Sequence, residues 1–433
     1  MDWKAIEREA TDLLSEYLRI DTTNPPGNER KAIDFLGRHL KQEGLAVEIV
    51  GQDPDRPNLI CRLSSGKNRK GLMLLHHCDV VGADPREWEV DPFGGEVKEG
   101  YVYGRGALDM KGMGIMELMA FVLAHRHKIP LRNDLLLVAS CDEESGSSFG
   151  ADYLAQHHPQ ELESAWVLNE GGCGWEMGGW ESVLLGIGEK GPLWVRLIAE
   201  GKAGHGSIPH GRNPCEALVD GLSALKAAER PLRILPEMKT LLASLGLDGL
   251  PAEALADQPF LQIPQIRAMF QDTLSLTMLQ GGYRPNVIPA RAEAALDIRV
   301  LPDRSTADML TDLTKALPAG LCRLEVIRTI EASRSPVDNE FFHCLEGLAK
   351  QFFPRALFLP GIFPGFTDSR CFRRLGMICY GWIPAMIPAE DLERVHGVNE
   401  RIRIQDLITG IQVIFEVIQR MVGDQGPEEP ETK

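Results

Sequence analysis

The sequence lacks runs of basic residues, and its 62 acidic residues outnumber its 46 Lys and Arg, which gives a formal net charge of −16. Proteins that bind nucleic acid carry basic patches or stripes, so this composition argues against a nucleic-acid partner. The same negative charge gives no reason to bind an anionic membrane surface. We therefore expect neither nucleic acid nor a membrane as a partner.

Long apolar runs are also missing, and none reaches the length of about 20 residues that crosses a bilayer. The N-terminal segment MDWKAIEREATDLLSEYLRI shows apolar residues at helical spacing, not the basic and then apolar regions of a secretory signal. Nine cysteines are scattered singly without a CxxC pair, which favours free thiols over a disulfide framework. These absences predict a cytoplasmic location.

The chain has 433 residues, of which 25% are charged and 44% hydrophobic, so it is typical of a globular protein with two domains. Helix and strand patterns alternate along 1–186 and 303–422, which predicts one α/β domain interrupted by an α+β insertion at 187–302. The polar segment 423–433 is expected to be disordered, and 231–270 has no clear period. The clearest helix patterns are 29–44, 110–127 and 213–228, and the clearest strand patterns are 71–76, 133–140, 192–200 and 291–300.

Polar residues follow several apolar strands at the point where each strand ends. The stretch LMLLHHCD ends with His77 and Asp79 two residues apart, so both lie on one side of an extended chain. Ligands of open α/β sheets bind outside the carboxyl ends of the strands. Imidazole is a common metal ligand, and a carboxylate such as Asp79 can orient it. The alternative is a strand end capped by satisfied polar groups.

Four further segments have carboxylates or a histidine at comparable positions. Asp109 lies between glycines in GRGALDMKG, where it can bridge two metals or cap the helix that follows. Glu143 and Glu144 belong to an acidic triplet after a strand, and such acids repel one another unless a cation lies among them. Glu170 ends an apolar strand in VLNEGG. His396 lies in a loop before the last helix, where a lone histidine is more commonly structural.

Together these two histidines and three carboxylates can hold two divalent ions, with one carboxylate bridging. Nitrogen and oxygen ligands without paired cysteines suit zinc, cobalt or manganese. An extra acid beside a ligand, as Glu143 lies beside Glu144, is what metal-assisted hydrolysis requires as a general base. The sequence therefore predicts a hydrolytic metal site, and we expect the adjacent Cys78 and Cys141 to pack rather than bind metal.

A set of short motifs occurs along the chain in the order typical of one family. These motifs are RIDTTNPPGNE, HCDVV, GRGALDMKG, DEESGS, NEGG, GHGSIPH, NVIPA and HGVNERI. Over nearly its whole length the chain resembles the co-catalytic zinc hydrolases that include aminoacylase-1, glutamate carboxypeptidase, acetylornithine deacetylase and succinyl-diaminopimelate desuccinylase. The resemblance implies a zinc-peptidase-like catalytic domain with a central mixed sheet. It also implies that 187–302 is a lid and dimerisation domain, and hence that the protein is a homodimer.

The resemblance implies five metal ligands, each on a matching motif. His77 and Glu170 would hold one ion, and Glu144 and His396 would hold the other. Asp109 would bridge both. The implied ions are two divalent metals, with zinc expected and cobalt or manganese as alternatives.

Other motifs imply residues that act on the substrate. Glu143 would be the general base and Asp79 would support His77. His205 of GHGSIPH would stabilise the reacting carbonyl, often across the dimer, although such a histidine is otherwise a turn residue.

Three positions match family residues that approach the substrate, namely Asn286 of NVIPA, Arg299 of LDIRVLP and Arg370 of GFTDSR. A guanidinium suits this role because it pairs bidentately with a carboxylate. Either arginine could instead belong to a structural ion pair. Phe366 stands where a second small residue is common in the family, and we expect it to narrow the pocket.

The implied reaction is hydrolysis of an amide next to a free carboxylate, in N-acyl amino acids or in short peptides. The enzyme would be of the deacylase (deacetylase) or carboxypeptidase type. One alternative is an amidohydrolase that acts on carbamoyl or ureido compounds. Another is an inactive metal-binding scaffold protein, which would not need Glu143.

Overall fold

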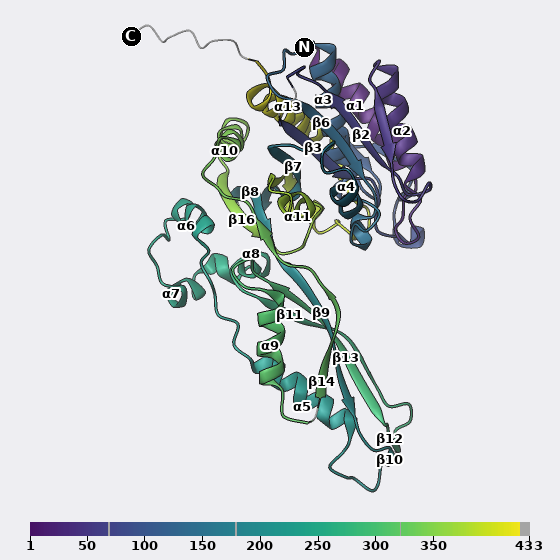
Figure 1. The fold of residues 1–433 in the computed structure, drawn as a ribbon, viewed down its shortest axis with the longest axis vertical. Helices are drawn as coiled ribbons and strands as arrows, with labels where there is room; N and C mark the ends of the chain where they lie inside the picture. The colour runs from purple at the N-terminus through teal and green to yellow at the C-terminus, as the bar shows by residue number, and fades with distance from the viewer. Residues whose placement is uncertain (68–69, 178–179, 321, 425–433) are drawn as a thin grey trace. The chain divides into compact units, whose positions relative to one another are not determined.

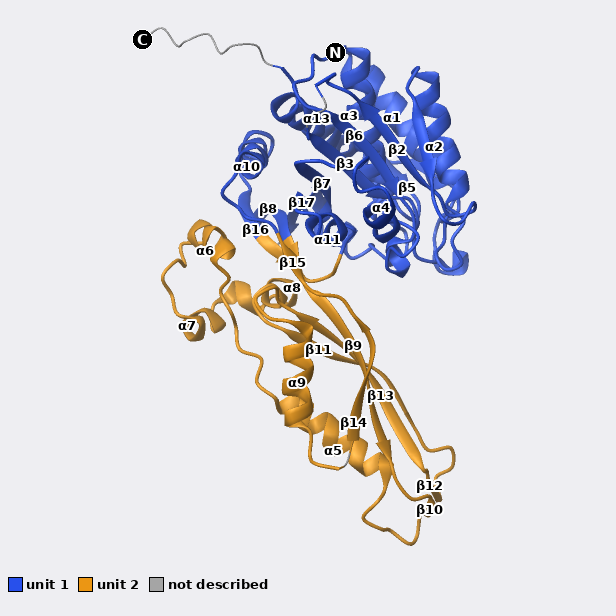
Figure 2. Ribbon diagram, in the orientation of Figure 1, with its two compact units in different colours: residues 1–187, 335–360, 367–433 blue, residues 188–334, 361–366 orange. Residues whose placement is uncertain are grey.

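The structure is a computed structural model that describes residues 1–67, 70–177, 180–320 and 322–424 (Figure 1). Residues 425–433, most of the expected disordered tail, lie outside the described residues. The chain forms two compact units, which Figure 2 shows in different colours. Unit 1 consists of residues 1–187, 335–360 and 367–433, and unit 2 of residues 188–334 and 361–366.

Unit 2 extends further along the chain than the insertion expected at 187–302. The extra segment contains helix α9 (Thr306–Ala316) and strand β14 (Cys322–Thr329), and β14 pairs with β9 (Gly191–Glu200) in the sheet of unit 2. The sequence does not reveal this boundary, because helix and strand patterns alternate on both sides of residue 302.

Unit 1 is built on a mixed sheet, as expected for this fold class. Its strands lie in the order β1, β2, β6, β3, β7, β17, β8, and β16 also pairs with β8. Neighbours β6, β3, β7 and β17 are parallel to one another, whereas β1, β2 and β8 are antiparallel to their neighbours. The strands are β1 (Val47–Val50), β2 (Asn58–Leu63), β3 (Leu72–His77), β6 (Leu135–Ser140), β7 (Trp166–Met177), β8 (Trp180–Glu189), β16 (Leu357–Phe363) and β17 (Ile378–Pro388).

Helices cover both faces of this sheet, and for that reason every residue of β3 and β6 is buried. Helices α1, α3 and α13 pack against one another (Figure 1). On the face that carries Met73 and Val138, helices α4 and α11 supply Leu154 and Phe372 to the core. The helices of unit 1 are α1 (Trp3–Leu18), α2 (Arg30–Gln42), α3 (Lys111–Arg126), α4 (Ala151–His157), α10 (Glu340–Phe352), α11 (Ser369–Arg373), α12 (Ala389–Leu392) and α13 (Ile404–Met421).

Unit 2 contains a four-stranded antiparallel sheet in the order β11, β13, β9, β14. Alternate residues of β13, such as Leu296 and Ile298, are buried against Leu218 of α5 and Met309 of α9, because successive side chains of a strand point to opposite faces. The segment 231–270, unassigned from sequence, forms short helices. The remaining elements of unit 2 are β10 (Gly204–His205), α5 (Pro214–Ala227), α6 (Lys239–Ser244), α7 (Ala252–Ala256), α8 (Pro264–Ala268), β11 (Thr273–Gly281), β12 (Val287–Ile288), β13 (Arg291–Val300) and β15 (Ser333–Arg334).

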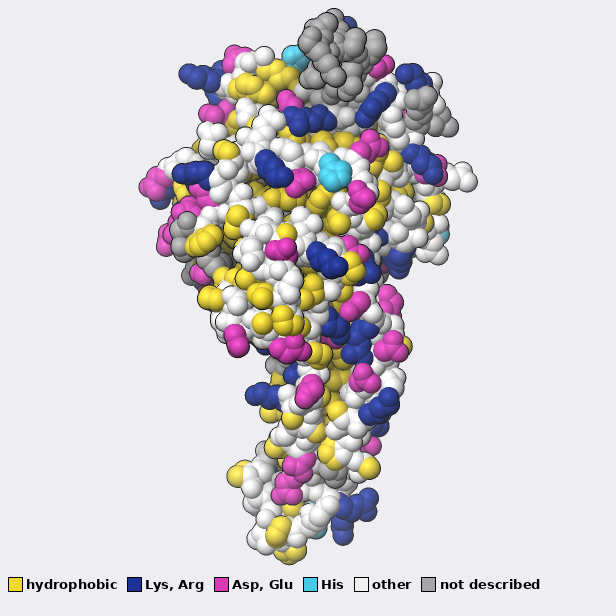
Figure 3. Space-filling view, turned by 90° about the vertical axis from the view of Figure 1, so that its left-hand side faces the viewer, with side chains coloured by type: hydrophobic (Ala, Val, Ile, Leu, Met, Phe, Trp, Pro, Cys, Tyr) yellow, Lys and Arg dark blue, Asp and Glu magenta, His cyan; other side chains and the backbone are white. Residues whose placement is uncertain are grey.

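A small three-stranded sheet completes unit 1, with the order β18 (Arg401–Arg403), β5 (Tyr101–Tyr103), β4 (Glu96–Lys98). All nine cysteines are free thiols. Among the described residues, no helix combines the length and the apolar character needed to cross a membrane. On the face shown in Figure 3, basic and acidic side chains are interspersed rather than separated by sign.

Candidate metal centre

The predicted ligands meet because parallel strands end at the same edge of the sheet of unit 1. His77 is the last residue of β3 and lies opposite Ser140, the last residue of β6. Glu143 and Glu144 follow in a 3₁₀ turn directly after β6, and Glu170 lies on β7, the other parallel neighbour of β3. The sheet topology therefore gathers side chains that lie far apart in the sequence.

The first group of ligands consists of His77, Asp109 and Glu170, whose ligand atoms all lie within 4.8 Å of one another. Nε2 of His77 lies 3.1 Å from Oδ1 of Asp109 and 3.6 Å from Oε1 of Glu170. Nδ1 of His77 lies 3.0 Å from the backbone oxygen of Asp79 and donates its proton there. Nε2 therefore faces the two carboxylates and is the nitrogen that would bind a metal once its proton is displaced.

The second group consists of Asp109, Glu144 and His396, and Asp109 belongs to both groups. Nε2 of His396 lies 3.0 Å from Oδ2 of Asp109 and 3.5 Å from Oε2 of Glu144. The two oxygens of Asp109 thus face different histidines, and this is the arrangement of a bridging carboxylate.

The chemistry of these groups fits divalent cations. Burial raises the pKa of Glu170 well above its ordinary value, and the neighbouring Asp109 raises it further. Hydrogen bonds that His396 donates to Asp109 and Glu144 raise the pKa of His396 to about 10. Oε1 of Glu144 is buried and has no hydrogen-bond partner among the described residues. Buried glutamates with raised pKa values, together with a buried carboxylate oxygen that has no partner among the described residues, favour a cation at this site.

Glu143 lies beside the ligands but belongs to neither group. Its side chain is buried, which raises its pKa well above the ordinary value, and the nearby Glu170 adds to the rise. A carboxylate with a raised pKa, close to a metal site, is suited to accept a proton and return it.

Asp79 contacts both His77 and the segment that carries Glu143 and Glu144. The carboxylate oxygen Oδ1 of Asp79 lies 3.5 Å from Nδ1 of His77, whereas the backbone oxygen of Asp79 lies 3.0 Å from the same nitrogen. The two carboxylate oxygens of Asp79 also accept the backbone N–H groups of Glu143 and Glu144, each at 3.1 Å. Burial alone would raise the pKa of Asp79, but the contact with His77 holds it below the ordinary value.

Two buried acids near the site were not identified from the sequence, and Glu400 is the first. Its carboxylate accepts hydrogen bonds from the backbone N–H groups of Gly106, Leu108 and Asp109 at 2.8–3.1 Å and from Nη1 of Arg105 at 2.7 Å. Glu400 therefore fixes the loop that presents the bridging carboxylate. The only sequence signal was its place in the motif HGVNERI.

The second is Asp368, whose carboxylate accepts hydrogen bonds from Ser140 at 2.7 Å and Ser147 at 2.5 Å. These serines flank the segment that carries Glu143. Asp368 is fully buried and near enough to Glu143 to raise the pKa of that carboxyl.

Arg370 is 2% exposed and pairs within unit 1. Its guanidinium lies 3.3 Å from Oδ2 of Asp152 and donates to the backbone oxygen of Gly146 at 3.1 Å. These contacts match the structural ion pair that was the alternative for this residue. Its contact with substrate stays a prediction.

The remaining predicted substrate residues belong to unit 2. The exposed His205 pairs with Val287 across β10 and β12, and Gly206 donates to the backbone oxygen of Asn286 at 2.8 Å, so His205 and Asn286 lie close together. Arg299 lies near the C-terminal end of β13, where its guanidinium pairs with the carboxylate of Asp297 at 2.8 Å.

Aromatic rings surround this arginine. The guanidinium of Arg299 lies 5.6 Å from the ring of Phe366 and 5.9 Å from that of Trp194, and Arg328 lies over the same two rings. Phe366, the departure from the family pattern, is thus a stacking partner of the arginines of unit 2.

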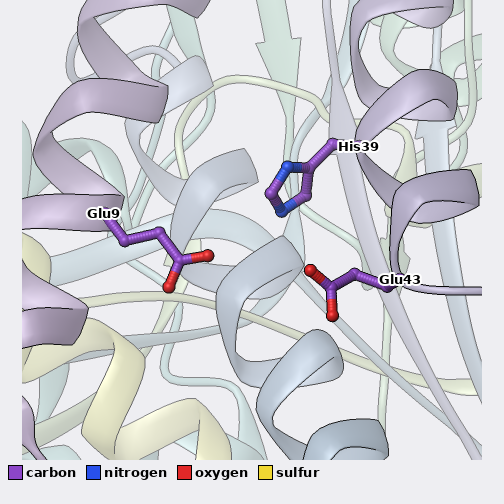
Figure 4. Close-up of side chains that lie close together, drawn as sticks. All are labelled: Glu9, His39 and Glu43. Atoms are coloured by element: carbon purple, nitrogen blue, oxygen red, sulfur yellow. The ribbon is translucent and has the colours of Figure 1, made fainter.

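A further group of possible ligands, Glu9, His39 and Glu43, lies among the helices of unit 1 (Figure 4). Arg126 of α3 pairs with Glu9 at 2.6 Å and with Glu43 at 2.7 Å. Both carboxylates already have Arg126 as a cationic partner, and these ion pairs link the helices. No metal ion is needed to explain why these side chains lie together. Cys78 and Cys141 are buried, and burial raises the pKa of both thiols, in agreement with a packing role.

Comparisons with known proteins identify the family of this chain. Residues 73–420 match the model of peptidase family M20/M25/M40. The N-fatty-acyl-amino acid synthase/hydrolase PM20D1 of Xenopus tropicalis is 30% identical over 383 residues, which is 84% of this chain and 75% of that protein. Aminoacylase-1 of Sus scrofa is 26% identical over 425 residues, 96% of each chain.

Solved structures agree on the fold. The M20 metallo-carboxypeptidase Sso-CP2 of Sulfolobus solfataricus superposes with a TM-score of 0.77 at 21% identity, covering 95% of this chain and 99% of that one. Because the family model matches most of its length, the chain belongs to peptidase family M20/M25/M40.

Proposed function

We propose that the protein is a di-metal hydrolase that cleaves an amide bond next to a free carboxylate, in N-acyl amino acids or short peptides. The observation that carries the proposal is the position of Asp109, whose two oxygens face His77 and His396, with Glu143 beside them. Family membership and the names of the relatives, a fatty-acyl-amino acid synthase/hydrolase and an aminoacylase, support this substrate class.

The metal ligands would be His77 and Glu170 for one ion, Glu144 and His396 for the other, and Asp109 for both. We propose zinc, because nitrogen and carboxylate ligands suit it, with cobalt or manganese as functional substitutes. When bound, such ions polarise a carbonyl and lower the pKa of a water molecule to about 7.

Three groups of the chain would carry out the proton transfer and charge stabilisation. Glu143 would take the proton of the attacking water and return it to the leaving amine. Asp79 would hold the turn of Glu143 in place through its two backbone hydrogen bonds. His205, from this chain or from a partner copy, would stabilise the developing oxyanion.

Asn286, Arg299 and Arg370 are the proposed substrate contacts. Arg299 is the stronger candidate for the substrate carboxylate, since its guanidinium is partly exposed and presents a planar fork. Arg370 is buried against Asp152, so it would act on the substrate only by releasing that partner.

Unit 2 would serve as lid and dimerisation domain. Its edge strand β11 exposes Leu276, Met278 and Leu279 at 49%, 58% and 61%. An apolar edge strand offers unpaired backbone groups and apolar area to a second copy, so we propose a homodimer through this strand. A cytoplasmic location is proposed from the nine free thiols.

The test is hydrolysis of two small libraries, N-acyl amino acids and dipeptides, by zinc-loaded protein, with a chelated sample as control. We expect metal-dependent release from at least one library, and the responding library decides between deacylase and carboxypeptidase. Release from neither library by metal-loaded protein would contradict the proposal, and a ureido or carbamoyl substrate would then be tested before an inactive scaffold is accepted.

A further inference from the structure

The loop between α1 and α2 contains the motif NPPG, for which the proposed mechanism gives no role. The loop lies against the segment that follows β3. Thr22 donates its hydroxyl proton to the backbone oxygen of Cys78 at 2.7 Å, and backbone hydrogen bonds join Asn24 to Val80 at 2.9 Å and Val80 to Thr22 at 3.2 Å. These bonds bracket Asp79, so the loop is built around that carboxylate.

Asn24 is 4% exposed, and its amide group contacts two buried carboxylates. Nδ2 donates to Oδ2 of Asp79 at 2.8 Å and to Oδ1 of Asp142 at 3.1 Å. Its Oδ1 is buried without a hydrogen-bond partner among the described residues. An Asn amide has two N–H donors, and here both are used on carboxylates while the acceptor stays unused.

Both carboxylates form hydrogen bonds that hold the segment carrying the proposed base Glu143. Asp79 accepts the backbone N–H groups of Glu143 and Glu144. Asp142 directly precedes Glu143, has a left-handed backbone with φ of 66°, and accepts the backbone N–H of Phe149 at 3.1 Å. The single amide of Asn24 therefore ties the end of β3 to the start of the turn that carries the proposed base and a metal ligand.

Charge explains why an amide stands here rather than an acid. Asp142 already pairs with Arg56 at 2.9 Å, and Arg56 also pairs with the buried Glu29 at 2.5 Å. Aspartate at position 24 would add a carboxylate beside Asp79 and Asp142 with no donor for either. A neutral donor of the same shape joins two like charges that would otherwise repel each other.

We infer that Asn24 is a positioning residue of the metal centre, which acts through Asp79 and Asp142 to hold Glu143 and Glu144 in register with the ions. The inference rests on the proposed function. Groups that orient metal ligands commonly contribute about 10–100-fold to metal affinity or activity, and this is the size of effect expected here.

The test uses Asn24→Ala and the isosteric Asn24→Asp in the full chain, with Asn339→Ala as the matched control. Asn339 caps α10 and donates to Pro336 and Tyr380, so its loss removes four side-chain hydrogen bonds, compared with two for Asn24, far from Asp79 in the sequence and outside the ligand groups. Each protein is measured for zinc affinity, for the visible spectrum of the cobalt-loaded form, for kcat and KM, and for thermal unfolding.

We expect both Asn24 variants to bind zinc about 10–100-fold more weakly or to lose kcat by that factor, with an altered cobalt spectrum. Asn339→Ala should lower only the unfolding temperature. Zinc affinity, kcat and a cobalt spectrum like those of the wild type in Asn24→Ala, or a normal Asn24→Asp protein, would overturn the inference. If the wild type cleaves neither library, the proposed reaction fails, but zinc affinity and the cobalt spectrum still decide the role of Asn24.

Discussion

Asp109 and His396 lie 3.0 Å apart, measured from Oδ2 to Nε2. The other oxygen of Asp109 lies 3.1 Å from Nε2 of His77, so the carboxylate stands between two imidazoles that come from distant parts of the chain. Removal of this one charge should affect both ligand groups, whereas removal of either histidine should affect one.

Asp109→Asn is therefore expected to hold at most one ion in place of two and to lose at least about 100-fold in kcat, since even groups that only orient ligands cost about 10–100-fold. The measurement is metal content after dialysis, together with kcat. Asp134→Asn is the matched control, because Asp134 is buried in the same unit and pairs with Arg62 and Ser65 instead. Full metal content in Asp109→Asn would contradict a bridging role.

Neighbouring glutamates should give opposite results. Glu143→Gln is expected to keep its metal and to lose about 10²–10⁴-fold in kcat, because a general base contributes that much. Glu144→Gln is expected to lose metal, since its carboxylate belongs to a ligand group. Metal analysis and kcat of the two variants side by side check both roles, and loss of metal from Glu143→Gln would show that base and ligand were confused.

Metal binding should release protons. Hydrogen bonds that His396 donates to Asp109 and Glu144 raise the pKa of His396 to about 10, so this imidazole is protonated at pH 7 before metal binds. Because a cation must displace that proton, zinc affinity should fall as the pH falls from 10. The release is measured by titrating zinc into weakly buffered protein at pH 7.

His396→Asn is the comparison for this titration and should release fewer protons than the wild type. Since the folded-state pKa lies above the ordinary value of 6.5, the protonated His396 stabilises the metal-free protein, and this contribution is lost as the pH rises through 10. Equal release by the two proteins would show that His396 is not a ligand.

A charge on the edge strand of unit 2 should separate the proposed dimer. Leu279 of β11 is 61% exposed, and Leu279→Lys would place a charge in the interface. Analytical ultracentrifugation should give the dimer mass for the wild type and the monomer mass for the variant. Leu375→Lys, at a 42% exposed leucine of unit 1, should stay dimeric. A monomeric wild type would remove any role of His205 across subunits.

Lys190 should give unit 2 a pH-dependent stability. Its Nζ donates to the backbone oxygens of Ala268 and Gln271 and to the hydroxyl of Thr273, and burial lowers its pKa from 10.5 to about 7. Between pH 7 and 10.5 the unfolded chain holds a proton that the folded chain has lost. The free energy of unfolding should therefore rise with pH in this window.

The measurement is thermal unfolding of the wild type and of Lys190→Met from pH 6 to pH 10. Other titrating groups are common to both proteins, so the difference isolates Lys190. The wild type should gain stability relative to the variant as the pH rises from 7. A constant difference would show that the pKa of Lys190 is not lowered.

The sequence alone predicted much of the sheet and the candidate metal ligands that the structure brings together. The apolar patterns at 71–76 and 133–140 became β3 and β6, and the polar groups at their ends came together because parallel strands finish at one edge. Such patterns depend on local periodicity, which a sequence displays directly. The acidic residues of the motifs could likewise be identified, because the motifs occur in the family's order along the chain.

Only the tertiary structure decided which long-range partners surround those ligands. Asn24, Glu400 and Asp368 approach the site from three different segments, and no local pattern marks a buried acid or amide as a support. From the sequence, Arg370 could be either a substrate contact or part of a structural ion pair. The structure shows that its side chain is buried and paired with Asp152. The sequence determined which groups can perform the chemistry, because side-chain types and strand periodicity are local. The fold decided which groups hold them in place, because hydrogen bonds between distant segments form only once the chain has packed.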